Sequence, residues 1–416
     1  MAVVARVARS ALSLSIALAL AGGANAQTAE SEAESKPVQL EAVQVTAQRR
    51  VENIQDVPMA ISSLAAEKLD AMTASGEDIR FLAARLPSLQ IESSFGRAFP
   101  RFYIRGLGNT DFDLNASQPV SLVYDDVVQE NPILKGFPVF DVEQIEMARG
   151  PQGTLFGRNS PAGVIKFNSV RPFGETDGYV RAGWGQRQTM NLEGAVGGAL
   201  GEGVAARISL LHQRRDDWVD NIHNGPGDDL EGYRESAGRF QLLFSGRDGF
   251  EALANVHARA LDGTARLFRA GALVPGSNDF VPGFRRDQVS FDAGNEQELD
   301  SLGGSLRLRW DFERYSLYSI TGYESVEVFS RGDIDGGSLY GFPPDQLHEA
   351  LFPAESADGL PEHAQWSQEL RIESREWGRF DWQAGLYWFD EALEVDSFSF
   401  DTLGDGGING RAWQRQ

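Results

Sequence analysis

Residues 140–167 combine charged side chains with four glycines and two prolines in one compact segment. Val142, Ile145 and Met147 give the segment an apolar side. Its other face carries four charged residues, Asp141, Glu143, Glu146 and Arg149. Side chains of this kind can form ion pairs, and nothing in the chain resembles a nucleophile with its base or a phosphate-binding glycine loop. The sequence therefore predicts no catalytic residues and no enzyme.

The composition excludes further kinds of chemistry. The chain has no cysteine, which rules out disulfides, thiolate metal sites and cysteine nucleophiles. Its five histidines are spread without a close pair, so we expect neither a metal site nor a cofactor. The formal net charge of -22 disfavours nucleic acid as a partner, because phosphate would be repelled.

Short strands and turns must position the charged residues. Glycines punctuate two short apolar runs, residues 154–156 and 164–167, as turns between small strands would. Upstream, residues 57–72 predict a strand followed by a helix, and residues 76–86 predict a second helix that ends before Pro87. Residues 51–172 are therefore expected to form one mixed α/β domain.

Three segments carry a resemblance to a known family: residues 140–167, the run IRGLG at 104–108 and the run VYDDVV at 123–128. Together they resemble the plug-domain signature of TonB-dependent outer-membrane receptors. Ala148 and the pair Ser160 and Pro161 depart from the usual pattern. The resemblance implies these plug-core positions: Arg105, Gly106, Glu143, Glu146, Arg149, Gly150, Gly153 and Gly157.

The first 26 residues have the layout of a secretory signal peptide. Arg6 and Arg9 precede an apolar run at 11–21, and Ala24-Asn25-Ala26 follows, so we expect cleavage after Ala26. No later stretch reaches about 20 uninterrupted apolar residues, so a membrane-spanning mature chain must span as a barrel. The expected location is the outer membrane of a Gram-negative bacterium.

Residues 27–50 are expected to be a flexible leader. Residues 27–39 are polar, and residues 40–50 contain a short run of good strand formers. An extended segment of this kind can add itself to another protein's sheet. It resembles the Ton box of the same family, which implies TonB, with its inner-membrane energising complex, as a partner. The TonB-binding residues would be Glu41, Ala42, Val43, Gln44, Val45, Thr46 and Ala47.

Residues 173–416 show the alternation of an antiparallel transmembrane β-barrel. In residues 306–312, for example, Leu306, Leu308 and Trp310 alternate with Arg307 and Arg309. About nine such strands are expected, with outward loops near 262–301 and 329–364, and outer-membrane lipid as a partner. The resemblance implies about 22 strands, so the barrel would be incomplete. We therefore expect either the N-terminal portion of a longer receptor or a truncated product.

The implied function is TonB-dependent import of a scarce, bulky small-molecule ligand, a metal chelate of the ferric siderophore type. Carbohydrate, vitamin and aromatic-compound receptors of the same family remain alternatives, as do a passive porin or adhesin and a non-functional truncated remnant. Charged pairs can hold a plug that must move. We therefore expect Arg149, Arg105 or Arg158 to pair with inward carboxylates such as Glu369 or Glu373.

Overall fold

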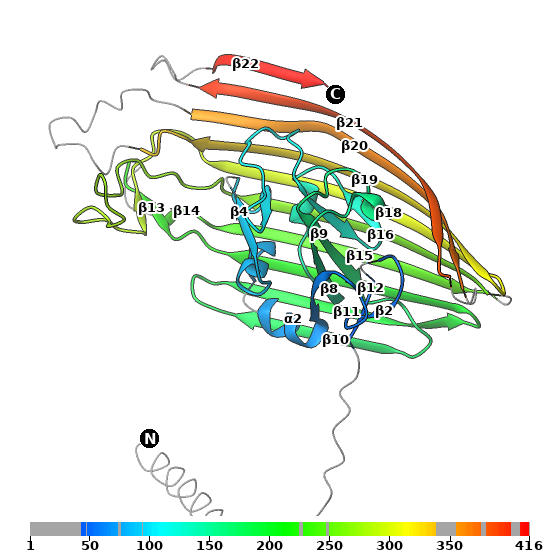
Figure 1. The fold of residues 1–416 in the computed structure, drawn as a ribbon. Helices are drawn as coiled ribbons and strands as arrows, with labels where there is room; N and C mark the ends of the chain where they lie inside the picture. The colour runs from blue at the N-terminus through cyan, green and yellow to red at the C-terminus, as the bar shows by residue number, and fades with distance from the viewer. Residues whose placement is uncertain are drawn as a thin grey trace, which may run out of the picture. The chain divides into compact units, whose positions relative to one another are not determined.

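The computed structural model describes residues 43–46, 48–73, 76–93, 95–223, 228–246, 249–337, 355–375, 380–400 and 408–415. Two groups of elements follow one another along the chain (Figure 1). A mixed group ends with β9 (Gly163–Ser169), and a long antiparallel sheet begins with β10 (Asp177–Trp184). The proposed boundary near residue 172 lies between these two strands. We call residues 51–172 the plug domain and the long sheet the wall.

The plug domain is built on a five-stranded sheet in the order β3-β8-β9-β6-β7. Strands β6 and β9 run parallel, and the other neighbours are antiparallel. The bounds are β3 Ala60–Ala65, β6 Val120–Tyr124, β7 Val127–Gln129 and β8 Val142–Arg149. Its smaller elements are β2 Glu52–Asn53, β4 Leu89–Ser93, β5 Pro100–Ile104 and the 3₁₀ turn η2 Leu134–Gly136, and β1 Gln44–Val45 precedes the domain in the leader.

Two helices follow the first strand of this sheet. The predicted strand followed by a helix is confirmed, because α2 (Ala66–Thr73) comes directly after β3. The second predicted helix is the shorter 3₁₀ helix η1 (Ile79–Ala84), whose first turn is capped by the Asp78 carboxylate accepting from the backbone N–H of Arg80. Ile79, Phe81 and Leu82 of η1 are buried in the plug core.

The signature segment folds as strand, helical turn and strand. Residues 164–167 lie in β9 as expected, but residues 154–156 belong to the helical turn α3 (Gly153–Phe156), and a strand there was a wrong prediction. The backbone N–H groups of Leu155 and Phe156 both donate to the Gln152 carbonyl, a local bond that an extended segment cannot make. Gly157, with φ of +78°, ends the turn.

The wall has ten strands in sequence order in the described part of the chain, each antiparallel to the next (Figure 1). Its strands after β10 are β11 Met190–Gly201, β12 Val204–Arg215, β15 Tyr233–Ser245, β16 Phe250–Gly263, β18 Glu296–Asp311, β19 Tyr315–Asp333, β20 Glu355–Ser374, β21 Gln383–Phe400 and β22 Ile408–Arg415. About nine strands were expected. The additional strand, β22, was missed because INGRAWQR shows no clean alternation of apolar and polar residues.

Side chains alternate across the wall as predicted. Large apolar residues such as Val180, Leu210 and Leu386 are exposed on one face. The opposite face buries polar and charged residues, among them Glu193, Arg207, Gln213, Glu235, Arg239, Gln241, Asn255, Arg259, Glu324 and Gln365. Apolar residues outside and charged residues inside are the pattern of a lipid-facing sheet around a wet interior. Among the described residues, no helix is long and apolar enough to cross a bilayer.

The two ends of the wall differ in their connections. Residues 202–203 and 312–314 form short links at one end, which we call the short-turn end. Residues 216–232 and 264–295 form long connections at the other, the long-loop end. These long connections contain a small sheet of β13 (Val219–Asn221), β14 (Asp228–Leu230) and β17 (Gln288–Val289) over an apolar cluster that includes Phe291.

Candidate functional site

The candidate TonB-binding segment lies against the plug domain at a buried carboxylate. Strand β1 pairs with β2 through Gln44 and Val45. The Glu146 carboxylate accepts from both the backbone N–H and the hydroxyl of Thr46, each at 2.9 Å, and Lys166 Nζ donates to the same hydroxyl at 2.9 Å. Glu146 is 1% exposed. The sequence places Glu146 on the face opposite Ile145 and Met147, and the structure shows that the leader covers that face.

Four residues of the candidate segment, Val43 to Thr46, are described, whereas Glu41, Ala42 and Ala47 lie outside the described residues. Gln44 and Val45 are extended, as predicted, and Val45 is buried. The side chain of Gln144 donates to the Gln44 carbonyl at 2.9 Å. The described part of the segment is therefore held on the plug by a few specific hydrogen bonds.

Arg49 joins the leader to both the plug and the wall. Its guanidinium lies 3.2 Å from the Asp126 carboxylate of the plug and 3.3 Å from the Glu369 carboxylate of β20. The same group stacks over the Phe156 ring at 4.5 Å, and the side chain is 3% exposed. Arg50 donates to the Trp382 carbonyl at 2.6 Å. Trp382 directly precedes β21, and Glu369 lies near the end of β20 before the connection between the two strands, so the leader is anchored toward the short-turn end.

Asp126 is the centre of this ionic contact. Besides Arg49, its carboxylate pairs with Lys166 at 3.2 Å and with Arg307 of β18 at 3.4 Å. Burial alone would raise the pKa of Asp126, but the charges of Lys166, Arg307 and Arg49 outweigh it and hold the pKa well below its usual value. Asp126 therefore stays ionised and connects leader, plug and wall at neutral pH.

Ion pairs join plug and wall, but the residues that form them differ from the predicted ones. Arg149 donates to the Ala60 carbonyl and to the Ser62 hydroxyl of β3, so its predicted pair with Glu369 is not formed. The side chain extends along the plug sheet, and Arg49 occupies the position next to Glu369. Arg158 does bridge to the wall, at 3.3 Å from Glu391 and 3.2 Å from Glu130 of the plug.

The remaining predicted site residues lie in turns, on an exposed strand face or in contacts within the wall. Glu373 accepts from the Tyr318 hydroxyl at 2.5 Å within the wall, instead of pairing with Arg158. Arg105 and Gly106 form a tight turn after β5, with φ of +53° and +79°. Glu143 is exposed on β8. Three glycines lie in the connections on either side of α3 or at its start: Gly150, Gly153 and Gly157.

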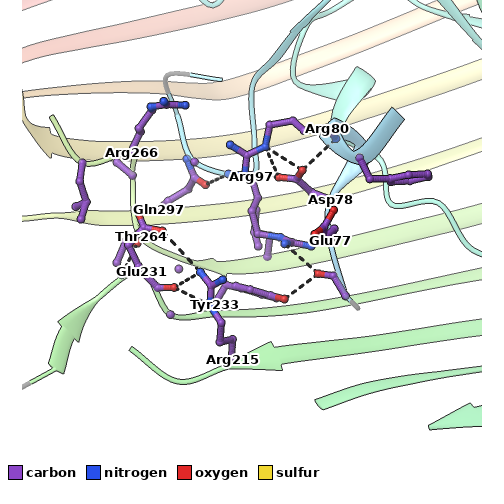
Figure 2. Close-up of a pocket in the computed structure, with 18 of the residues that line it drawn as sticks. Glu77, Asp78, Arg80, Arg97, Arg215, Glu231, Tyr233, Thr264, Arg266 and Gln297 are labelled. Carbon is purple, nitrogen blue, oxygen red and sulfur yellow. Dashed lines mark hydrogen bonds and ion pairs between the residues drawn. The ribbon is translucent and has the colours of Figure 1, made fainter. Parts of the chain in front are cut away.

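A cavity of about 830 Å³ lies between the plug and the long-loop end of the wall. Figure 2 shows that the lining combines plug residues such as Asp78 and Arg97 with Arg215 and Tyr233 of the wall. Arg97 pairs with the buried Glu235 carboxylate at 2.6 Å and stacks over the Tyr233 ring at 4.0 Å. The plug is thus fixed to the wall at the cavity as well as at the leader.

Asp78 is one of two acidic residues, with Glu77, on the plug side of the cavity. Burial would raise its pKa, but the hydrogen bond and charge of Arg80, at 2.7 Å, and the charge of Arg97 hold the pKa below its usual value. No group of three or more metal-ligating side chains placed to hold an ion occurs in the described part of the chain. The arginine and carboxylate side chains of the lining offer hydrogen bonds and charge to a ligand.

Sequence reasoning missed Arg49, Arg307 and the cavity. A signal for Asp126 was present, since it lies in the VYDDVV run that carried the family resemblance. Arg49 directly follows the strand-forming part of the leader, but its partner Glu369 is 320 residues away along the chain. Only the folded sheet brings such distant residues together.

The geometry defines a class of protein: a plug domain packed on the charged face of an antiparallel sheet whose other face is apolar. Residues 53–164 match the TonB-dependent Receptor Plug Domain family. The pesticin receptor of Yersinia pestis is 30% identical over 164 residues, 39% of this chain and 24% of the receptor. The vitamin B12 transporter BtuB of Photobacterium profundum is 29% identical over 182 residues, 42% of this chain and 28% of the transporter.

The same class appears among solved structures. The ferric yersiniabactin uptake receptor FyuA from Yersinia pestis superimposes with a TM-score of 0.68 at 20% identity, over 82% of this chain and 50% of the receptor. The resemblance to TonB-dependent outer-membrane receptors is thus confirmed in sequence and in fold. These similar proteins are described as a receptor, a transporter and an uptake receptor. The chain spans about half the length of that solved receptor.

Proposed function

We propose that this chain is part of a TonB-dependent importer of a scarce, bulky ligand, a ferric siderophore, across the outer membrane of a Gram-negative bacterium. The observation that carries the proposal is the separation of two sites. The candidate TonB-binding segment is docked near the short-turn end, and the cavity lies at the long-loop end. Short connections face the periplasm in such barrels and long ones face outward.

The docked segment could exchange its strand partner β2 for a strand of TonB. Strand β1 pairs with β2 over only two residues, so TonB could replace β2 by adding a strand with little loss of backbone pairing. Glu146 and Lys166 would then release Thr46. Ligand bound in the cavity and TonB bound to the leader would act on opposite ends of one plug domain.

The proposed boundaries follow the same scheme. Residues 1–26 would be the signal peptide, 27–50 the leader, 51–172 the plug domain and 173–416 part of the barrel.

Iron chelates are the favoured ligands because FyuA is described as a ferric yersiniabactin uptake receptor and Fiu of Escherichia coli as a ferric-catecholate import receptor. A vitamin remains the main alternative, since vitamin B12 transporters are also similar to this chain.

The experiment replaces Val45 by proline in the protein as its native outer membrane contains it. Proline removes a backbone donor that a strand needs, so TonB capture and energised uptake of a radiolabelled ferric chelate are expected to be lost while chelate binding at 4 °C is kept. Glu32→Pro, in the polar leader upstream, is the matched control and should transport normally. Uptake that persists in Val45→Pro and after collapse of the proton gradient would instead indicate a passive porin.

A further inference from the structure

A row of inward-facing residues on five neighbouring wall strands lies against one edge of the plug sheet. The row crosses β16, β18, β19, β20 and β21 (Figure 1), whose register places these residues opposite one another: His257, Gly303, Glu324, Gln365 and Glu391. The plug strand that it faces is β7, the last in the order of the five-stranded sheet. An edge strand presents backbone N–H and C=O groups that need partners.

Wall side chains supply partners to this edge. The Gln365 amide donates to the Val128 carbonyl at 2.7 Å, and its oxygen accepts from the backbone N–H of Glu130 at 3.1 Å. The Gln129 side chain donates to the Glu324 carboxylate at 3.1 Å. Gln365 and Glu324 are both buried. These contacts fix the edge of the plug sheet to the wall.

Strand β7 lies between two other contacts of plug and wall. Asp126, which pairs with Arg49 of the leader and with Arg307 of the wall, directly precedes it. Ile133, which packs in an apolar cluster with Leu299 of the wall, follows it a few residues later. A movement that starts at the leader must therefore pass along β7 before it reaches the apolar cluster. The strength of the β7 contact decides how far such a movement spreads.

His257 is the histidine of the row. Its Nε2 atom lies 3.1 Å from the Glu324 carboxylate, and its ring packs edge-on against the Phe137 ring of the plug, with 5.0 Å between the ring centroids. A Cβ added at Gly303, on the strand between them, would collide with both the imidazole and the carboxylate. We propose that protonation of His257 strengthens the contact of β7 with the wall, because the charged imidazole fixes the Glu324 carboxylate where Gln129 binds it.

The charged groups around His257 favour Glu324 as its partner. Arg239 lies opposite His257 on β15, and Arg259 lies further along β16. Both cations oppose a charge on His257, but Arg259 pairs with the buried Glu235 carboxylate at 2.8 Å, and Arg239 donates to backbone carbonyls of the plug. Glu324 is the carboxylate within hydrogen-bond distance of the imidazole. A hydrogen bond between two charged groups is among the strongest that side chains form.

Other titratable groups near the row do not change charge between about pH 5.5 and 7.0, where an imidazole does. On the plug side, burial raises the pKa of Tyr124, so its hydroxyl stays neutral. Lys135, whose pKa burial lowers to about 8, stays charged. His363, the other inward histidine of the described wall residues, lies 3.2 Å from Glu391, but its Nδ1 atom has no hydrogen-bond partner. Charging His363 would therefore bury an unpaired N–H.

The test measures hydrogen exchange of the β7 amides in the full receptor, purified in detergent from its native outer membrane. Protection factors of a peptide that covers residues 127–130 are compared at about pH 5.5 and about pH 7.0, after correction for the intrinsic exchange rates. A peptide that covers β8 is the internal reference, because β9 and β6 separate β8 from β7 in the plug sheet.

The variants separate the charge of His257 from its packing. His257→Gln removes the titratable group and keeps a side chain that forms hydrogen bonds. Gly303→Ala keeps both charged groups but pushes them apart. His257→Lys keeps a positive charge at both pH values. His212→Gln is the matched control, because His212 contacts Ser236 and shares the outer face of β12 with Leu210.

In the wild type, the protection factors of residues 127–130 should be roughly tenfold higher at the acidic pH, the factor expected for one hydrogen bond between charged groups. His257→Gln and Gly303→Ala should lose this difference, and His212→Gln should keep it. His257→Lys should show the higher protection at both pH values, which a merely structural role of the imidazole would not produce.

Equal protection at both pH values in the wild type would overturn the inference, as would a pH difference that survives in His257→Gln. Loss of protection in the β8 peptide identifies a variant whose plug unfolds. His257→Lys then decides the question, because a pH difference that persists in this variant contradicts the role of His257. The measurement needs neither ligand nor TonB, so a negative result here would leave the proposed import function standing.

Discussion

Replacing Arg49 by glutamine should release the leader from the plug. The side chain is 3% exposed and contacts Asp126 at 3.2 Å, Glu369 at 3.3 Å and the Phe156 ring. Neither carboxylate would be left alone, because Asp126 keeps Lys166 and Glu369 keeps Arg371 at 2.8 Å. The loss should therefore stay below the roughly 3 to 5 kcal/mol expected when a buried charge is left unpaired.

We estimate about 2 kcal/mol, the usual contribution of hydrogen bonds to a charged group. At about 1.4 kcal/mol per factor of ten, the ratio of docked to released leader should fall about 30-fold. The chain has no cysteine, so a cysteine in place of Val43, which is 49% exposed, can carry a single nitroxide label. The released leader should add a mobile component to the electron paramagnetic resonance spectrum.

Arg149→Gln is the control for this measurement, since Arg149 contacts only β3 in the hydrogen bonds described above. It should leave the spectrum unchanged. In a double-mutant cycle, Arg49→Gln and Glu369→Gln should show a coupling free energy of about 0.5 to 3 kcal/mol. An immobile label in Arg49→Gln, or a coupling of zero, would refute the view that this ion pair holds the leader.

Two further predictions concern the plug domain. Gly163→Ala should destabilise the plug domain by at least about 2 kcal/mol in thermal melts. An added Cβ would lie 2.9 Å from Ile104 and closer still to the Ala148 carbonyl, and the backbone of Gly163 has a φ of +151°. Gly174→Ala is the control, because an added Cβ there meets nothing within 4 Å. Burial lowers the pKa of Lys135 from 10.5 to about 8, so the unfolded chain binds more protons between these values and stability should rise with pH from about 8 to 10, by up to about 3 kcal/mol over the full range. Lys135→Met should remove that slope in unfolding curves measured at several pH values, and an unchanged slope would exclude Lys135 as its source.

Local patterns in the sequence were enough for the type and order of most elements. Alternation with period two identified nine of the wall strands, because apolar and charged faces meet lipid and water. The failures arose where local patterns are weak. The sequence INGRAWQR shows no alternation of apolar and polar residues, so β22 was missed. The helical turn α3 depends on backbone hydrogen bonds to the Gln152 carbonyl, which a glycine-rich sequence does not predict.

The candidate sites were harder to predict because they join distant residues. The candidate TonB-binding segment and the plug signature are contiguous motifs, so the local sequence is enough to suggest them. Arg49 and Glu369, and the cavity residues Arg80, Arg215 and Arg266, come from distant parts of the chain. Only the packing of leader, plug and wall brings them together. The hypothesis that charged pairs hold the plug stays a prediction. It assigned Arg149 to Glu369, which Arg49 contacts in the structure.

The contact between plug and wall is not uniform along the plug. Near the leader it consists of ion pairs, such as Arg49 with Glu369 and Asp126 with Arg307. Toward the long-loop end it includes an apolar cluster, in which Phe99 and Ile133 of the plug pack with wall residues such as Leu299. This cluster adds to the charged contacts that the sequence predicts, since inward apolar side chains there are shared by both domains.

The two kinds of contact respond differently to a pull on the leader. Breaking an ion pair separates charged groups that water can solvate, and it exposes little apolar surface. Separating the apolar cluster would expose Phe99 and Leu299 at about 25 cal/mol for each Å² of apolar surface. Force applied at residues 44–50 should therefore first rearrange the region around Glu146 and Asp126 while the cluster keeps the rest of the plug in place. An energised opening that starts at the leader, and not expulsion of the whole plug, is the movement that this distribution of contacts favours.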